Sequence, residues 1–307
     1  AITSPSGTAD TMSVVAPVEF STGELKKIAL KTGGAIVWGG SLHLAPADDI
    51  FIGVEHPLQI DPEPQMIASI MAKKLAVGAD FMVLDLPVGH EAKISSSDEG
   101  RKLSFKFINM GDKLVIKVRC GITYGGQPVG YAIGPALEAR EALQALEGKG
   151  PTSLVEKSTA LAGMLLELGG KAARGEGQAL ASQILASGKA LEKLSEIIDA
   201  QGGDGKVRSA EIPVGKCKAE MVAPCDGYIT RVSNAAMNQI ARAAGAPIEK
   251  GAGIVLHGKE GHKVSKGQKV IEIFAERDSR VDEAYDLAVK LSPIGIEGML
   301  LQEVSSD

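Results

Sequence analysis

The stretch ASIMAKKLAVGADFMVLDLPVG, residues 68–89, carries the signals that decide the fold class. Its first half completes an amphipathic helix predicted for residues 61–76, which opens with Asp-Pro and ends just before Gly78. Its second half contains FMVLDL at 81–86, an apolar run that is typical of a central strand. A helix followed by a buried strand is the unit of α/β proteins, so this stretch predicts a sheet covered by helices.

The same alternation continues on both sides of this stretch. The sequence predicts further helices at 24–31, 97–113, 135–146, 152–168 and 177–198, and further strands at 35–40 and 114–118. We therefore expect an α/β fold with a largely parallel sheet flanked by helices.

A change in composition divides the chain. DAQGGDGK at 199–206 has the composition of a linker. After it the sequence is rich in β-forming segments, namely GYITRVS, GIVLHG and KVIEIFA, with one helix near 234–243. We expect an α/β domain at 1–204 and a smaller α+β domain at 205–307.

Composition excludes several classes of function. The 307 residues carry a net charge of −5 and only 4% aromatic residues, which argues against binding to nucleic acid or to anionic membranes. The three cysteines are scattered, as expected for reduced thiols in the cytoplasm. No apolar run reaches the length of a membrane span, so we expect a soluble cytoplasmic protein.

The first twelve residues, AITSPSGTADTM, are dense in hydroxyl groups around one glycine. Hydroxyls and backbone amides of this kind bind phosphate without a side-chain cation. The alternative is an ordinary turn-forming terminus, and this stretch by itself does not decide between them.

Two positions of the 61–76 helix are candidates for chemistry. Asp61 is placed either to cap the helix or, if partly buried, to act as a general acid. Ser69 and Lys73 stand four residues apart, so they share one helix face, opposite the apolar stripe. They are placed to grip a planar ligand, or they form a solvated polar face.

Lys93 follows the strand predicted at 81–86, where ligands gather in open α/β sheets, and suits a phosphate or a ring acceptor. His90 is the one histidine near these candidates, and the histidines lack metal-binding spacing. The glycine-rich loop at 121–134 leads into a helix but is not a dinucleotide fingerprint.

Four ordered blocks of sequence resemble the thymidine/pyrimidine nucleoside phosphorylase family, and within it the archaeal AMP phosphorylase branch: ITSPSGTADTM, KTGGAIVWGGSLHLAPADD, ASIMAKKLAVGADFMVLDLPVG and QPVGYAIGPALEAREAL. The segments APCDGYITRVS and VSKGQKVIEIFA resemble the hammerhead-like C-terminal domain of these enzymes. The resemblance implies that 1–204 binds phosphate and nucleotide, with 46–76 similar to part of the family's helical domain.

The resemblance also implies roles for single residues. Asp61 falls on the family's proton donor, and Ser69 and Lys93 fall on nucleotide contacts. Lys73 falls on the lysine that reads the base with Ser69 in the pyrimidine enzymes. The family's substrate loop falls on Ala1, Ile2, Thr3, Ser4 and Thr8. The pyrimidine enzymes have a base-gripping arginine where this chain has Val54, which favours a purine nucleotide over thymidine.

The implied reaction converts AMP and phosphate to adenine and ribose 1,5-bisphosphate. Phosphate is then a co-substrate, no cofactor or metal is implied, and the enzyme is expected to be a homo-oligomer. Family members carry further sequence before the ITSP block, so we expect this chain to be the C-terminal part of a longer enzyme. A start at Ala1 after removal of methionine is the rival explanation.

Two other functions stay open from the sequence. One is phosphorolysis of thymidine or another pyrimidine nucleoside. The other is a fragment that serves only as an assembly module. A lipoyl-like carrier domain is the least favoured, because no lysine lies at a suitable hairpin tip.

Overall fold

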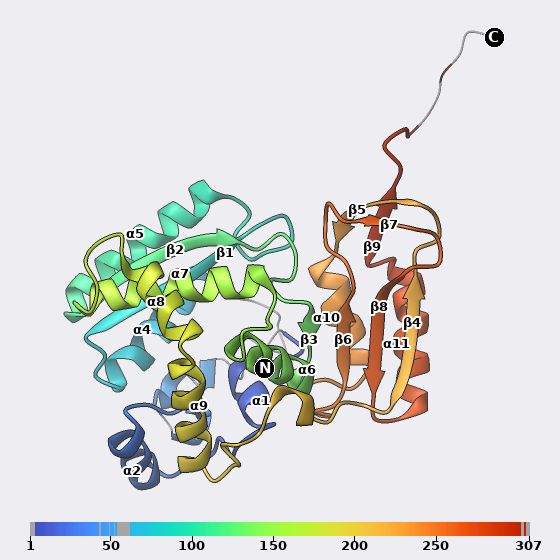
Figure 1. The fold of residues 1–307 in the computed structure, drawn as a ribbon. Coiled ribbons are helices and arrows are strands. Elements are labelled where there is room, and N and C mark those ends of the chain that lie inside the picture. Colours follow the sequence, from blue (N-terminus) through green and yellow to red (C-terminus); the bar gives the residue numbers. More distant parts are fainter. Residues whose placement is uncertain are drawn as a thin grey trace.

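The computed structural model describes residues 4–42, 44–48, 50–51, 53, 62–301 and 304. An N-terminal part holds the elements α1 to α9, and a C-terminal part holds β4 to β9 with α10 and α11 (Figure 1). The short strand β3 lies between them in the chain and joins the sheet of the C-terminal part.

The N-terminal part is built around a parallel pair of strands. Strand β1 (Phe81–Val88) pairs with β2 (Lys117–Tyr124) in a register that runs from Phe81 opposite Lys117 to Val88 opposite Tyr124. Helix α5 (Ser97–Leu114) makes the crossover between them, as parallel strands require. The predicted α/β class and the parallel pairing are therefore confirmed.

Helices cover both faces of this pair. Helix α5 and helix α4 (Glu63–Ala76) bury one apolar cluster with the strands, in which Phe107 is fully buried. Helix α7 (Thr152–Leu168) lies on the other face, where Leu161 and Met164 adjoin Gly121 of β2. Alternate residues of β2 face opposite helices because side chains alternate along a strand.

The parallel sheet expected in the N-terminal part is present, but among the described residues it holds fewer strands than the sequence predicted. Among the described strands only β1 and β2 pair in parallel, while the two larger sheets are antiparallel. The apolar runs that predicted strands carry no information about which strands will become neighbours.

The remaining helices of the N-terminal part follow the predicted pattern with one break. The stretch predicted as a single helix at 177–198 is divided at Gly188, whose φ of 79° is left-handed. Helix α7 packs closely on the helix after it, since Gly163 and Gly177 bring the two backbones into contact. The bounds are α1 Thr8–Met12, α2 Thr22–Thr32, η1 Gly39–Leu42, α6 Pro135–Leu146, α8 Gly177–Ala186 and α9 Lys189–Ala200.

Two strand predictions need correction. The strand predicted at 35–40 does not form, because 35–38 has no regular secondary structure and Gly39 begins the 3-10 helix η1. The N–H groups of Ile36 and Trp38 donate instead to Gln201 Oε1 and to the carbonyl of Val18. The strand predicted at 114–118 begins only at Lys117, because α5 continues to Leu114 and Val115 adopts a left-handed conformation.

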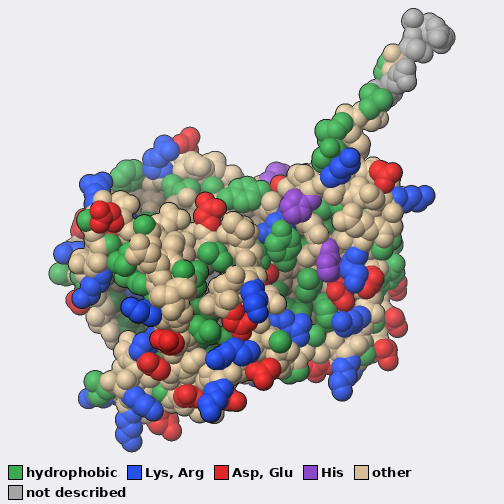
Figure 2. All heavy atoms as spheres, viewed as in Figure 1, with side chains coloured by type: hydrophobic (Ala, Val, Ile, Leu, Met, Phe, Trp, Pro, Cys, Tyr) green, Lys and Arg blue, Asp and Glu red, His purple; other side chains and the backbone are tan. Residues whose placement is uncertain are grey.

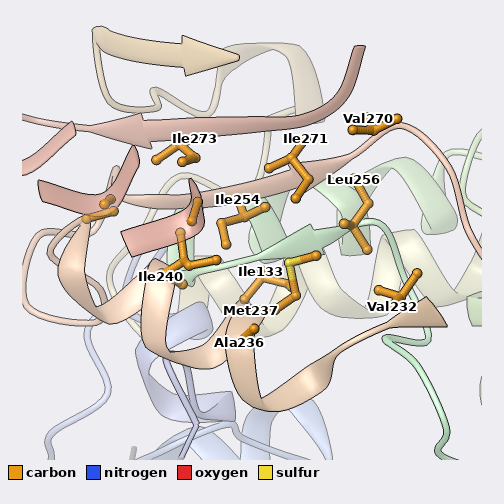
Figure 3. Packing of buried hydrophobic residues seen from close by; sticks show 14 of the residues in the cluster. Ile133, Val232, Ala236, Met237, Ile240, Ile254, Leu256, Val270, Ile271 and Ile273 are labelled. Carbon is orange, nitrogen blue, oxygen red and sulfur yellow. The ribbon is translucent and has the colours of Figure 1, made fainter. Parts of the chain in front are cut away.

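The C-terminal part holds both antiparallel sheets, in the orders β3-β6-β8-β4 and β7-β5-β9. Its apolar core lies between the larger sheet and two helices (Figure 3). The predicted β-rich segments and the helix near 234–243 are confirmed. The bounds are β3 Ala132–Ile133, β4 Cys217–Val222, β5 Gly227–Val232, α10 Asn234–Ala243, β6 Gly253–Leu256, β7 Lys263–Val264, β8 Lys269–Ala275, α11 Asp278–Leu291 and β9 Ile294–Glu297, with the short turn η2 at Ser209–Glu211.

The stretch predicted as a linker is firmly attached. Gln201 is 2% exposed, and its side-chain amide donates to the carbonyls of Pro17 and Ile36. The domain boundary itself stays a prediction.

The distribution of charge on the visible surface agrees with the small net charge of the sequence. Figure 2 shows Lys and Arg side chains interspersed with Asp and Glu over the visible face. None of the helices in the described ranges is long and apolar enough to cross a membrane.

Candidate functional site

Several predicted site residues lie outside the described residues. They are Ala1, Ile2 and Thr3 of the substrate loop, the general-acid candidate Asp61, and Val54. Their roles stay predictions. Ser4, Thr8, Ser69, Lys73 and Lys93 are described, and they lie in three separate segments of the chain.

From Ser4 onward, the hydroxyl-rich loop is held by hydrogen bonds among its own groups and from α10. Gly7 caps α1, and its N–H donates to Asp10 Oδ2 at 2.8 Å. Ser4 Oγ donates to the carbonyl of Ser6 at 2.7 Å, and Arg242 of α10 donates to the carbonyl of Ser4 at 2.9 Å. Thr8 is exposed. In this described part, the hydroxyl of Ser4, a predicted phosphate donor, donates to the protein itself.

A cavity of about 540 Å³ adjoins this loop. Its polar wall consists of Ser6, Gly7, Thr8 and Thr11 from the loop and α1, with Glu138 and Glu141 from α6. The rest of the wall is mainly apolar. The volume is in the range of pockets that hold small molecules.

Glu138 ties the loop to α6 across this cavity. Its carboxylate accepts from Thr11 Oγ1 at 3.2 Å and from the N–H of Gly134 at 3.0 Å, while Ser6 and Thr11 share a hydrogen bond of 3.0 Å. Burial raises the pKa of Glu138 above its usual value, and the nearby Glu141 adds to this effect. Sequence reasoning missed Glu138, which looks like an ordinary acidic residue of a helix first turn.

Helix α4 brings Ser69 and Lys73 together, as their spacing predicts. Lys73 Nζ donates to Ser69 Oγ at 3.3 Å. The apolar stripe faces the core at Ile67 and Met71. The sequence predicts that Leu75 continues this stripe, but it is 52% exposed in the last turn of the helix, so the buried stripe is shorter than predicted.

A third residue completes this group. Asp48 Oδ2 accepts from Ser69 Oγ at 2.9 Å and pairs with Lys73 Nζ at 2.7 Å. Asp48 is 6% exposed, and Lys73 is 37% exposed. We call Asp48, Ser69 and Lys73 the base-face triad. Asp48 lies within the quoted block KTGGAIVWGGSLHLAPADD, which was the one available signal for it.

Lys93 lies in the loop beyond the carboxyl end of β1, as predicted. This loop is fixed by Glu91, whose carboxylate accepts from Ser233 Oγ at 2.8 Å and from the N–H of Ala235 at 2.9 Å, at the start of α10. Partial burial opposes ionisation, yet these hydrogen bonds hold the pKa of Glu91 below its usual value. His90 is exposed beside it.

The polar groups of the site are carboxylates, hydroxyls and lysines rather than metal-ligand clusters. Within the part of the chain that the structure describes, no group of three His, Cys, Asp or Glu side chains is placed to hold a metal ion. Ser69 and Lys73 present a hydroxyl beside an ammonium, and Lys93 presents an ammonium in a separate loop. Groups of these kinds bind polar and anionic ligands.

Comparison with known proteins places these features in context. Residues 228–295 match the family described as the pyrimidine nucleoside phosphorylase C-terminal domain. The chain is 52% identical over 305 residues to an AMP phosphorylase of Methanosarcina barkeri, covering 99% of the chain and 60% of that protein.

Two further relatives agree with this match. An AMP phosphorylase of Methanocaldococcus jannaschii is 54% identical over 307 residues, which is 99% of the chain and 61% of the relative. That of Pyrococcus horikoshii is 52% identical over 307 residues, with 100% and 61% covered. The chain thus spans about 60% of the length of these relatives. The predicted resemblance to nucleoside phosphorylases, and to archaeal AMP phosphorylases among them, is confirmed.

Proposed function

We propose that this chain serves the phosphorolysis of a nucleoside 5′-monophosphate, converting AMP and phosphate to adenine and ribose 1,5-bisphosphate. The observation that carries the proposal is an identity above 50% to AMP phosphorylases along almost the whole chain. Because the chain spans about 60% of those relatives, the activity of the complete enzymes is proposed here and is open to direct test.

The reaction exchanges one bond at the anomeric carbon of the ribose. A phosphate oxygen forms a bond to C1′ as the C1′–N9 bond breaks, through an oxocarbenium-like state. The bonding electron pair leaves with the base, and a proton from Asp61 neutralises the departing base. The 5′-phosphate is unchanged and appears in the product.

Different described residues are proposed to contact different parts of this substrate. The base-face triad is proposed to contact the adenine through Ser69 and Lys73. The loop with Ser4 and Thr8 and the lysine Lys93 are proposed for the two phosphate groups, the attacking phosphate and the 5′-phosphate. An ammonium or a hydroxyl group stabilises a bound anion. Lys93 carries an ammonium and Thr8 an exposed hydroxyl, whereas the hydroxyl of Ser4 would have to turn away from the carbonyl of Ser6 to contact phosphate.

We further propose a self-associating cytoplasmic enzyme that uses phosphate as co-substrate and no cofactor. Composition supports the location, and the family resemblance supports the self-association.

The test measures base release from AMP and from thymidine in parallel, each with and without phosphate. We expect adenine release from AMP that depends on phosphate. Thymine release alone would show that the chain acts on pyrimidine nucleosides instead of AMP. Adenine release without phosphate would contradict phosphorolysis. Absence of both bases would show that these 307 residues do not suffice for the reaction.

The Asp61→Asn variant tests the proposed acid in the same assay. Loss of a general acid typically lowers the rate by ~10²–10⁴-fold, so we expect kcat for AMP to fall by about that factor. The KM for phosphate is expected to stay within about twofold, since the acid acts on the base. Unchanged kcat would contradict the role of Asp61.

A further inference from the structure

We propose that Asp48 is a positioning residue. It orients Ser69 and Lys73 so that Ser69 accepts a hydrogen bond from an uncharged heterocyclic base and Lys73 donates one to it. This inference rests on the proposed function, because the base is the ligand that α4 would read. It assigns a role to a residue that sequence patterns did not select.

The three side chains of the base-face triad form a ring of mutual contacts. Asp48 lies in a helical turn at 46–48 and reaches across to the exposed face of α4. One carboxylate oxygen, Oδ2, accepts from both Ser69 Oγ and Lys73 Nζ, and Lys73 also donates to Ser69. Each of the three side chains therefore contacts the other two, which fixes the rotamers of Ser69 and Lys73.

The protons in this triangle can be assigned. A carboxylate only accepts hydrogen bonds, so the Ser69 hydroxyl must donate to Asp48. The oxygen of Ser69 then accepts from Lys73 with one lone pair and has a second for a ligand. Lys73 has three N–H groups, of which two are directed to Asp48 and Ser69. Its side chain is 37% exposed, and we infer that the third N–H is available to a ligand.

The face that results offers one acceptor beside one donor. Such a pair is complementary to a base edge on which an N–H lies next to a ring nitrogen or a carbonyl. The charges of Asp48 and Lys73 compensate each other, which favours a neutral ring over an anion. Without Asp48 the hydroxyl of Ser69 could turn and donate, and the polarity of the face would be undefined.

Burial of Asp48 supports a functional reason for its retention. Its second oxygen, Oδ1, is buried, and no donor among the described residues lies within hydrogen-bonding distance of it. A buried carboxylate with one oxygen unsatisfied is a poor stabilising element. Lys73 is exposed enough to be solvated without an ion pair, so solvation does not require the buried Asp48. Positioning of Lys73 and Ser69 explains the pair better.

Asp85 provides a matched comparison. It accepts from the hydroxyl of Thr123 at 2.6 Å and pairs with Lys157 at 2.8 Å, so it has the same kinds of partner as Asp48. It differs in that each carboxylate oxygen has its own partner and the side chain is 32% exposed. Asp85 joins β1 to β2 and α7, and nothing assigns it to the base.

The experiment compares Asp48→Asn with Asp85→Asn in the 307-residue chain. Hydrogen bonds that involve a charged group are the stronger ones, so we expect Asp48→Asn to raise the KM for AMP roughly tenfold or more. The KM for phosphate is expected to change by less than about twofold. Asp85→Asn is expected to leave both KM values unchanged.

A second measurement does not depend on turnover. Acylation of each lysine is followed by peptide mass spectrometry, with adenine present and absent. We expect Lys73 to react faster in Asp48→Asn than in the unchanged chain, and adenine to protect Lys73 only where Asp48 is intact. Ser69→Ala keeps the Asp48–Lys73 pair and is expected to raise the KM for AMP without faster acylation of Lys73.

These outcomes separate the inference from the proposed function. Equal Lys73 reactivity with Asp48 and with Asn at that position would overturn the inference, as would an equal rise of both KM values in Asp48→Asn. If the unchanged chain releases no adenine from AMP, the proposed function fails for this chain. The acylation and adenine-protection results would still decide the role of Asp48.

Discussion

At the scale of single residues, Ser69 and Lys73 face each other because four residues complete about one turn of α4. That contact follows from spacing and was predictable. Their partner Asp48 was not, since it precedes Ser69 by 21 residues and reaches it only through the tertiary fold. Local rules describe neighbours along one element and are silent on side chains that arrive from another.

The environment of Glu138 was also not predictable from its neighbours in the sequence. Its place in the first turn of α6 suggests a solvated residue that favours the helix dipole. The structure instead places it against a mainly apolar cavity, where burial raises its pKa. The environment of a carboxyl group is a property of the packed molecule and not of its sequence neighbours.

Glu138→Gln is expected to stabilise the protein at high pH. A raised pKa in the folded state means that the native protein loses stability as pH rises from about 4.5, the usual value, through the folded pKa. Gln cannot ionise, so the variant avoids that loss, which is ~1.4 kcal/mol for each unit of pKa difference. Chemical denaturation of both proteins between about pH 4 and pH 9 measures this.

Glu24→Gln is the control, because its pKa shift has the opposite sign. Hydrogen bonds from Ser21 at the N-cap of α2 lower the pKa of Glu24. The unchanged protein is therefore expected to be more stable than Glu24→Gln at neutral pH, with a difference that shrinks on acidification. A difference between Glu138→Gln and the unchanged protein that does not vary with pH would contradict the assignment for Glu138.

At the scale of elements, helices with clear end signals were predicted best. Helix α6 begins at Pro135 and α7 ends before Gly169, and the observed bounds of both agree with those read from the sequence. The segment 35–38 failed as a strand because an apolar run becomes a strand only with a backbone partner. At Ile36 the side chain of the buried Gln201 replaces a strand partner, and the contact of Trp38 with the carbonyl of Val18 is a single backbone bond that does not extend into a ladder.

Glycine positions in helices depend on partners in a similar way. Gly163 lies in the middle of α7, where alanine normally favours the helix. A Cβ at Gly163 would overlap the backbone of Gln178 in α8. We expect Gly163→Ala to destabilise the protein by about 1–3 kcal/mol, measured by thermal or chemical unfolding.

Gly23→Ala is the matched control in α2. Nothing lies within 4 Å of a Cβ at Gly23, so the same substitution is expected to stabilise by up to ~1 kcal/mol. A stabilising effect of Gly163→Ala would show that the two helices do not pack as closely as described.

At the scale of the whole molecule, contacts distant in sequence hold the two parts together. Strand β3 joins the four-stranded sheet by pairing with β6. Glu91 accepts hydrogen bonds at the start of α10, and Lys259 donates to the carbonyl of Val129 and to Ser153 Oγ. Composition indicated two regions of different character, but these ties link residues more than 100 positions apart and have no local signature.

The same ties connect the site to the C-terminal part. Arg242 of α10 donates to Ser4 of the hydroxyl-rich loop, and Glu91 fixes the loop of Lys93 against the same helix. Two of the three segments that carry predicted site residues are thus supported by α10. The match of residues 228–295 to a phosphorylase C-terminal domain includes this helix.

We propose that phosphate breaks the glycosidic bond of AMP and that the 5′-phosphate stays on the sugar. Phosphorus NMR of AMP and phosphate incubated with the protein tests it most directly, with adenine measured in the same sample. We predict a sugar product with one phosphate on C1′ and one on C5′, formed in equal amount to adenine as phosphate is consumed. Formation of ribose 5-phosphate without consumption of phosphate would show hydrolysis instead, and would contradict phosphorolysis.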